Sequence, residues 1–180
     1  GIKPANVMSR LGYATSALWS SYGPTQQHKD QLGPFVIDNV ERGLKYTAED
    51  VARAHLQQSK IARNWLALFD EVDAVIAPAC SVPPFPHENG TVTQIDGQPL
   101  DTYMSWLALT YRPTMAMACV AAIPCGRDEN GLPFGVQVLG PPGSDRKILN
   151  IALALEQLFA QNPDTSRPLP DIAGLMKAAS

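Results

Sequence analysis

The chain has 180 residues, of which 45% are hydrophobic and only 17% are charged, and its formal net charge is −3. This composition excludes a disordered chain, which would carry more charge, and a basic nucleic-acid binder, which would concentrate lysine and arginine. No apolar run is long enough for a membrane helix and no secretory signal pattern is present, so we expect a cytoplasmic protein without a membrane or nucleic-acid partner.

Cysteine and proline usage narrows the class further. The three cysteines, Cys80, Cys119 and Cys125, lie in apolar surroundings, which indicates reduced, buried thiols rather than a disulfide framework. Ten of the 16 prolines fall between Pro78 and Pro142, where charges are also rarest. We expect most of that stretch to be covered by other protein.

The predicted organisation has three parts: an N-terminal helix and connector (1–31), a main domain (32–162) and a proline-rich tail (163–180).

The first half of the chain is predicted to be helical. Thr47 and Asp50 resemble a capping box, followed by apolar residues at helical spacing. In chain order we expect a helix over 5–19, a polar connector over 24–30, a short helix over 35–43 stopped by Gly43, and a long helix over 48–70.

The second half is predicted to alternate strands, turns and helices, which makes the chain α/β, with strands of a mixed central sheet flanked by helices. In chain order we expect a buried strand over 72–79, a loop over 81–100 with an extended piece (91–95) closed by Asp96-Gly97, a helix over 100–112 ended by Pro113, a central strand over 115–123, a hairpin turn over 128–131, its partner strand over 134–139, a turn over 140–143, a helix capped by Ser144, and a short final helix over 171–178.

Ionisable residues form no catalytic or metal-binding pattern. The acidic residues Asp70, Glu71 and Asp73 are sequence neighbours at a helix–strand junction and are interpreted as solvated surface. His28, His55 and His87 are not spaced as metal ligands, so we expect no metal and no cofactor. The cysteines have no adjacent base and are interpreted as inert packing.

Two further segments have an alternative functional interpretation. Gly140–Arg146 (GPPGSDR) is a glycine turn before a helix, which can bind phosphate, but its two prolines remove backbone donors and favour a plain turn. The serine pair Ser20-Ser21 has no nearby base and is interpreted as the end of a helix. The residues by themselves therefore define no active site.

Several blocks nevertheless resemble the amidase signature hydrolases, which include bacterial amidases and amidotransferase A subunits. The most specific block is similar to that family's G-L-P-x-G-x-Q strand with the turn and helix that follow. The resemblance covers about residues 32–160, through LGPF and TAEDVARA (within 32–54), FDEVDAVIAPA (69–79), IDGQPLDTYMSW (95–106), AAIPCG (121–126) and GLPFGVQVLGPPGSDRKILNIALALE (131–156).

This resemblance implies a hydrolase that cleaves a carboxamide C–N bond with a serine nucleophile, a second serine in a cis conformation and a lysine. In the family those residues lie in an N-terminal lysine and Gly/Ser-rich stretch, and none of the lysines here precedes such a stretch. The chain therefore resembles a C-terminal portion whose catalytic residues lie outside it, and we expect it to be inactive alone. Its expected partners are a small-molecule amide substrate in the full-length enzyme and either a second copy of the chain or the missing N-terminal catalytic half.

The sequence also departs from the family pattern. Thr114, Met117 and Cys119 stand where many members read N-x-x-G-x-P, and Leu107 stands where glutamine-specific members carry an acidic contact. Both departures favour an apolar or aryl amide over a glutaminyl substrate. By the resemblance, the candidates for lining the acyl pocket are Tyr103, Trp106 and Thr110, with core packing as the alternative for the two aromatic residues.

Two rival functions remain open on the sequence. One is a phosphate- or nucleotide-binding module that uses Gly140–Asp145, and the other is a non-catalytic subunit that docks onto a separate catalytic chain. An exposed half-sheet would present unpaired strand edges, so we also expect self-association.

Overall fold

The computed structural model describes residues 7–8, 10–14 and 29–178, so Ser20-Ser21 and His28 lie outside the described residues. The chain divides into two compact units, which are described separately below. The first unit comprises residues 1–73 and 86–118, and the second comprises residues 74–85 and 119–180.

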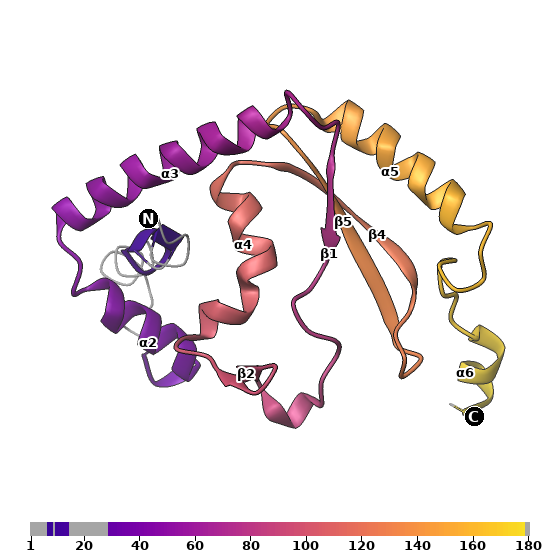
Figure 1. Ribbon diagram of the computed structural model, residues 1–180. Helices are drawn as coiled ribbons and strands as arrows, with labels where there is room; N and C mark the ends of the chain where they lie inside the picture. Colours follow the sequence, from indigo (N-terminus) through magenta and orange to yellow (C-terminus); the bar gives the residue numbers. More distant parts are fainter. Residues whose placement is uncertain (1–6, 9, 15–28, 179–180) are drawn as a thin grey trace. The chain divides into compact units, whose positions relative to one another are not determined.

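Helices dominate the first unit (Figure 1). The predicted helix over 35–43 is confirmed, and of the one predicted over 5–19, residues 7–8 and 10–14 are helical. The elements are η1 (Lys29–Gln31), α2 (Pro34–Gly43), α3 (Ala48–Leu68), η2 (His87–Asn89), β2 (Gln94–Ile95), β3 (Gln98–Pro99), η3 (Tyr103–Leu107) and α4 (Ala108–Met115).

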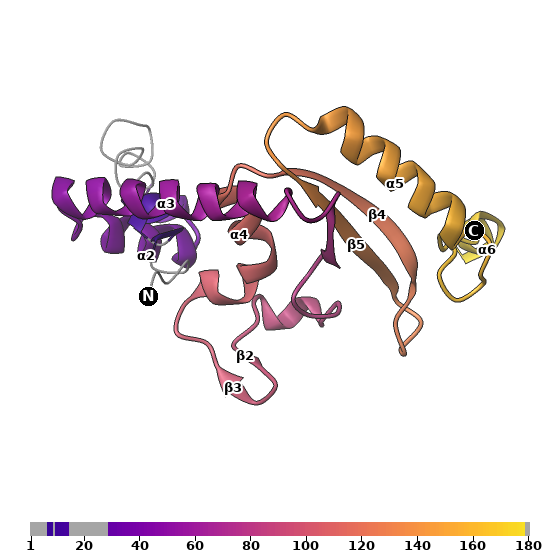
Figure 2. The ribbon, with the colours of Figure 1, turned by 45° about the horizontal axis from the view of Figure 1, so that its top comes forward.

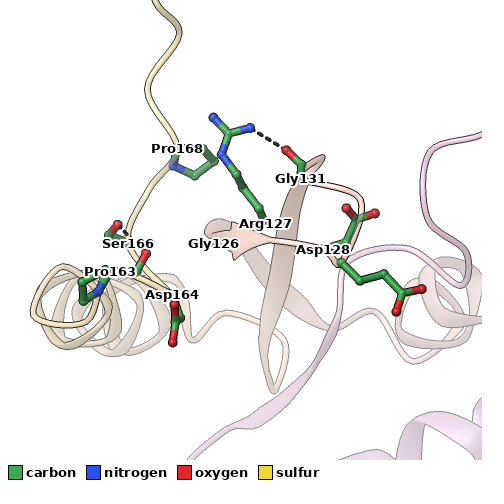
Figure 3. A pocket seen from close by; sticks show the side chains of 9 residues that line it. Gly126, Arg127, Asp128, Gly131, Pro163, Asp164, Ser166 and Pro168 are labelled. Carbon is green, nitrogen blue, oxygen red and sulfur yellow. Dashed lines mark hydrogen bonds between the residues drawn. The ribbon is translucent and has the colours of Figure 1, made fainter.

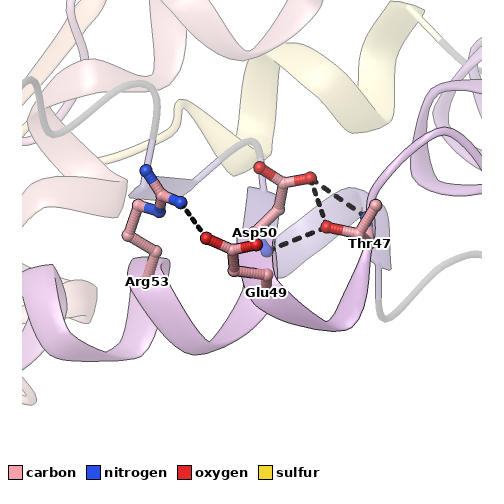
Figure 4. A network of polar contacts seen from close by, with 4 residues as sticks. All are labelled: Thr47, Glu49, Asp50 and Arg53. Carbon is pink, nitrogen blue, oxygen red and sulfur yellow. Dashed lines mark hydrogen bonds and ion pairs between the residues drawn. The ribbon is translucent and has the colours of Figure 1, made fainter.

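The start of α3 is set by the predicted capping box, which is confirmed (Figure 4). The Asp50 backbone N–H donates to Thr47 Oγ1 at 3.2 Å, and the Thr47 backbone N–H donates to Asp50 Oδ2 at 3.1 Å. Two amides that the first turn leaves unbonded are thereby satisfied. One turn further, Arg53 pairs with Glu49 on the exposed face of the helix.

The core of the first unit is one apolar cluster. Val7, Ala54, Tyr111 and Met115 are buried together, and Leu107 is among the partly buried residues packed against them. These side chains come from residues 7–14, α3 and the η3–α4 segment, which lie close together in Figure 1. The cluster therefore holds one side of α4 and leaves another side of that helix exposed.

A small hairpin precedes η3. Strands β2 and β3 pair antiparallel, and the predicted turn between them is confirmed at Asp96-Gly97, with φ values of 50° and 72°. Two successive positive φ values are the geometry of a tight hairpin turn, for which aspartate followed by glycine is well suited.

The second unit is a three-stranded antiparallel sheet in the order β1-β5-β4 with α5 packed on it (Figure 2). Ile123 and Val138 of the sheet pack with Ile148 and Ala152 of α5 as its core. The combination of helices and a sheet is confirmed, but the described strands pair antiparallel and do not form the expected mixed sheet. The elements are β1 (Val75–Pro78), β4 (Cys119–Arg127), β5 (Pro133–Gly140), α5 (Asp145–Phe159) and α6 (Ile172–Ala178).

The β4–β5 hairpin has the predicted turn at 128–131. Asp128 Oδ1 accepts from the backbone N–H groups of Asn130 (3.0 Å) and Leu132 (2.8 Å), and Gly131 has a φ of 78°. Before the turn, the pairing register shifts between Pro124 and Arg127. Gly126 lies in this bulge with a φ of 68°, a conformation that glycine adopts without steric cost.

Three sequence expectations about strands and helix ends were wrong. Residues 115–123 do not form the central strand, because the strand runs over Cys119–Arg127 and β5 pairs on both sides instead. The strand within 72–79 is not buried, since Ile76 is 53% exposed at a sheet edge. Pro113 lies inside α4, near its C-terminal end and buried, instead of ending the helix, so packing in the folded unit outweighs the local cost of an interior proline.

Local side-chain expectations were also corrected. Ser144 stands at the N-cap position of α5, but its hydroxyl donates backwards to the Pro141 carbonyl at 2.6 Å and makes no cap hydrogen bond. The cysteines are free thiols as expected, yet Cys80 is exposed and Cys119 and Cys125 are only half-buried. Burial depends on which segment covers a residue, and local composition does not encode that.

Candidate functional site

The predicted substrate-binding residues occupy one stretch of the first unit. Tyr103 and Trp106 belong to η3, and Thr110 lies in the first turn of α4. A 3₁₀ helix has three residues per turn, so positions 103 and 106 project from the same side. Thr110 follows four residues later, which continues the same side on an α-helix.

Phe35 joins this stretch from the start of α2. Its ring centroid lies 4.9 Å from that of Tyr103, and the Tyr103 centroid lies 6.1 Å from that of Trp106 with the ring planes at 86°. Both separations are in the range of favourable aromatic contacts. Phe35, Tyr103 and Trp106 are named the aromatic cluster from here on.

The aromatic cluster is accessible. Phe35 is 42% exposed, whereas Tyr103 and Trp106 are half-buried. Because the three rings are neither deeply buried nor isolated, they can pack against each other and also present faces to a flat, apolar ligand. Phe35 is not among the residues predicted from the sequence, because nothing near it in the chain indicates contact with residues so much further along.

Thr110 and Leu107 follow the aromatic cluster along the chain, and both make contacts within the first unit. Thr110 is exposed, and its hydroxyl donates to the Leu107 carbonyl at 2.8 Å. The Leu107 side chain is half-buried and packs against the core cluster of the unit. An apolar residue at this position provides no carboxylate for a ligand's ammonium group.

The Gly140–Arg146 turn in the second unit lets the start of α5 pack closely against the end of β5. A Cβ added to Gly140 would overlap the side chains of Ile148 and Ser144, so the absence of a side chain there admits the start of α5. Ser144 turns both its backbone N–H and its hydroxyl toward the Pro141 carbonyl. With these donors used internally and Asp145 in the first turn, the geometry disfavours an anion.

Cys119 lies beside this turn. Burial raises the pKa of its thiol, and the neighbouring Asp145 carboxylate raises the pKa further. A raised pKa keeps the sulfur protonated at neutral pH, whereas a nucleophilic cysteine needs a lowered pKa. This agrees with the interpretation of Cys119 as an inert packing residue.

A cavity of about 540 Å³ lies between the β4–β5 hairpin and the segment after α5 (Figure 3). Arg127 Nη1 donates to the Gly131 carbonyl at 2.6 Å, so that guanidinium supports the hairpin. The cavity contains none of the predicted site residues. It is lined by Gly126, Arg127, Asp128, Glu129, Gly131, Pro163, Asp164, Ser166 and Pro168.

Within residues 7–8, 10–14 and 29–178, no three His, Cys, Asp or Glu side chains are grouped to hold a metal ion. The acidic residues Asp70, Glu71 and Asp73 are exposed, as expected for solvated surface. In the same described part of the chain, no helix has the length and apolar content needed to cross a bilayer.

The glutamine of the most specific sequence block is structural. Gln137 is buried on the central strand β5, and its Nε2 donates to the Pro78 carbonyl of β1 at 2.9 Å. This bond ties two strands together and satisfies a polar group that would otherwise be costly to bury.

The fold is that of solved amidases. A crystal structure of an amidase matches with a TM-score of 0.76 at 23% sequence identity, covering 86% of this chain and 35% of that one. A bacterial aryl acylamidase of the amidase signature enzymes matches with a TM-score of 0.71 at 19% identity, covering 92% of this chain and 36% of that one. The chain therefore has part of the amidase signature fold.

Curated relatives agree with the fold. The A subunit of the glutamyl-tRNA(Gln) amidotransferase from Acidobacterium capsulatum is 32% identical over 155 residues, which is 86% of this chain and 30% of the relative. The 2-amino-5-chloromuconic acid deaminase of Comamonas testosteroni is 28% identical over 162 residues, 87% of this chain and 33% of the relative. The chain thus spans about a third of the length of these relatives.

The family model described as Amidase matches residues 17–149, well over half of the chain. This protein belongs to the amidase family, as the sequence blocks predicted.

Proposed function

We propose that this chain forms the acyl-binding part of an amidase that hydrolyses a carboxamide C–N bond. The observation that carries the proposal is the aromatic cluster, an accessible group of three rings next to Thr110 in a member of the amidase family. In this proposal the serine, cis-serine and lysine of the reaction lie outside the 180 residues. The role of the present residues is to hold the acyl side of the amide while those groups react.

The proposed substrate is an apolar or aryl amide rather than a glutaminyl one. Leu107 contributes a hydrocarbon side chain packed on the core, so it offers no charge to pair with an α-ammonium group. The aromatic cluster offers ring faces, which favour flat apolar groups.

The test is an assay of the 180-residue chain against a panel of aryl and aliphatic amides, with binding followed by NMR and turnover by product release. We expect aryl amides to bind without turnover. Turnover abolished by a serine-reactive phosphonate would overturn the placement of the catalytic groups outside the chain. Failure of every amide to bind would overturn the acyl-binding role.

A matched pair of variants sharpens the assay. Trp106→Ala should weaken aryl amide binding about tenfold, because one face of the ligand loses its aromatic contact. Trp65→Ala removes a tryptophan of α3 whose ring contacts Phe69 and not the rings of the aromatic cluster, and should leave the dissociation constant within about twofold. Equal effects of both variants would indicate a general loss of structure.

A further inference from the structure

Helix α6 has an apolar side that stays exposed in the second unit. Ile172, Leu175 and Met176 are 59–71% exposed, and their spacing of three and four residues keeps them on one side of the helix. The helix lies beyond residues 17–149, which match the amidase family model, so the family match does not account for it. Anchors at this spacing are typical of a helix that docks on another protein surface. We name these three residues the α6 ridge.

Helix α5 has a second exposed apolar surface, beside the face that packs on the sheet. Ile148 and Ala152 pack against the sheet, whereas Leu149 and Leu153 each follow one residue later and are therefore turned by about 100°. Leu149 and Leu153 are exposed and lie about one helical turn apart. Since the α6 ridge and this leucine pair are both exposed in the same unit, α6 does not cover α5 within one copy.

The charged residues next to these two surfaces run in opposite order. On α5, Arg146 precedes the leucine pair by about one turn and Glu156 follows it by about one turn. On α6, Asp171 comes before the α6 ridge and Lys177 after it. Parallel packing of the two helices places Asp171 near Arg146 and Lys177 near Glu156, whereas antiparallel packing brings like charges together. Exposed ion pairs add little affinity, but they decide which orientation is favoured.

The two surfaces also agree in length. Four residues separate the two leucines of α5, and four separate the ends of the α6 ridge, which is about 6 Å along each helix axis. The charged residues are about 15 Å apart on α5 and about 9 Å apart on α6, so a difference of about 3 Å remains at each end. The long side chains of Arg146 and Glu156 span that difference.

We propose that α6 is a docking helix that packs in parallel on Leu149 and Leu153 of a second copy of the chain. The occupant is a second copy because the charges that complement α6 are those of α5 in this same sequence. Each copy has one α6 ridge and one leucine pair, so the exchange is reciprocal and gives a two-fold symmetric dimer. The inference concerns association and does not depend on the proposed function.

The test measures the mass of the chain by sedimentation velocity over a range of concentrations. It uses the Ile76→Lys variant, because Ile76 is exposed on the edge strand β1, which provides a different surface for association. We expect a monomer–dimer equilibrium in that variant. A chain that stays monomeric at every concentration would overturn the docking of α6.

A matched pair of substitutions on α5 locates the interface. Leu153→Lys should raise the dissociation constant of the dimer at least about tenfold, because a charge replaces an apolar contact at the centre of the interface. Leu158→Lys is the control, since Leu158 is an exposed leucine of the same helix turned by about 140° from Leu153, and it should leave the constant within about twofold. Circular dichroism verifies that both variants are folded. Equal effects of the two substitutions would overturn the proposed interface.

A charge exchange tests the orientation of the helices. Glu156→Lys and Lys177→Glu should each raise the dissociation constant about fivefold, because each brings like charges together in the parallel arrangement. The double variant restores opposite charges and should return the constant to within about twofold of the parent. A double variant as weak as either single variant would overturn parallel docking.

NMR provides a direct readout of the contact. Copies with ¹³C-methyl-labelled methionine are mixed with unlabelled copies, and a filtered experiment detects only contacts between the two kinds of copy. We expect nuclear Overhauser effects between the Met176 methyl group and leucine methyl groups of the unlabelled copy. Their absence from a dimeric sample would place the interface elsewhere and overturn the proposal.

Discussion

Met117 stands where the amidase resemblance places a glycine, and its φ of 57° is in the region that glycine adopts most readily. The backbone geometry is therefore retained although the residue that suits it best is absent. Strain of this kind costs about 1 kcal/mol for a residue with a side chain. The cost is local and needs no change elsewhere in the fold.

Replacing this residue should therefore stabilise the protein. We expect Met117→Gly to raise the free energy of unfolding by about 1 kcal/mol, because the strain is removed and little packing is lost at an exposed position. Urea denaturation followed by circular dichroism measures the change. The matched substitution Met176→Gly lies in the right-handed helix α6 and should not stabilise. A lowered midpoint for Met117→Gly would contradict the strain.

Gly126 is required for a different reason, which is close contact. A Cβ at this position would overlap the carbonyl oxygen of Asp164, and the φ of 68° adds strain for any other residue. Gly126→Ala should therefore lower the free energy of unfolding by about 2–4 kcal/mol. Thermal denaturation and limited proteolysis of the segment around Asp164 provide the measurements.

The control for this prediction is a glycine in the same hairpin. Gly131 has a φ of 78° but no atom within 4 Å of an added Cβ. Gly131→Ala should cost only the backbone strain, about 1 kcal/mol. Equal losses in the two variants would mean that contact with Asp164 contributes nothing.

At the scale of elements, α3 depends on its capping box. Thr47→Ala should lower the free energy of unfolding by about 1 kcal/mol, because a backbone amide of the first turn loses its acceptor. Urea denaturation measures the loss. Ser59→Ala in the middle of the same helix removes a hydroxyl that only returns a bond to the His55 carbonyl and should change stability far less. A larger loss at Ser59 would contradict the capping role.

The capping box of Thr47 and Asp50 also makes the free energy of unfolding depend on pH. Hydrogen bonds from Thr47 lower the pKa of Asp50 in the folded chain. The resulting stabilisation is complete above the ordinary aspartate pKa and is lost as the pH falls through the lowered folded value. We expect Asp50→Asn to reduce the acid dependence of the unfolding midpoint below about pH 4. An unchanged pH profile would show that this carboxylate is not linked to folding.

Hairpin turns could be predicted from the sequence, whereas the order of the strands in the sheet could not. The turns at Asp96-Gly97 and around Gly131 follow from residues that tolerate positive φ, and both were predicted. The central position of β5 was not, since the apolar runs of β4 and β5 are equally compatible with an edge or a centre. Strand order depends on pairing between distant segments, which no local pattern encodes.

For the whole molecule, strand edges and exposed apolar residues imply association. Strand β1 pairs with β5, and with no other strand in the described part of the chain, and its Ile76 is 53% exposed. An unpaired edge with an apolar side chain is a template for pairing with another chain. We expect a dimer or larger species by light scattering, and Ile76→Lys should shift it toward monomer.

A surface substitution elsewhere provides the comparison. Leu56 is exposed on α3, outside any strand, so Leu56→Lys should leave the molar mass unchanged. A monomeric parent protein at high concentration would contradict the association.

The candidate site divides in the same way between what was and was not predictable. Tyr103, Trp106 and Thr110 were proposed from sequence blocks, and η3 and α4 place them on one side of a helical segment. Phe35 could not be proposed, because its contact with Tyr103 joins two segments far apart in the chain. A contact of that kind is a property of the folded unit.

The sequence by itself determined the family, the α/β class, the helix that begins at Thr47 and the hairpin turns, because capping and turn conformations depend on a few neighbouring residues. Tertiary structure alone decided that β5 is central, that Pro113 stays within α4 and that Met117 takes a positive φ. These features depend on which distant segments pack together, since packing and pairing energies outweigh local preference where the two disagree.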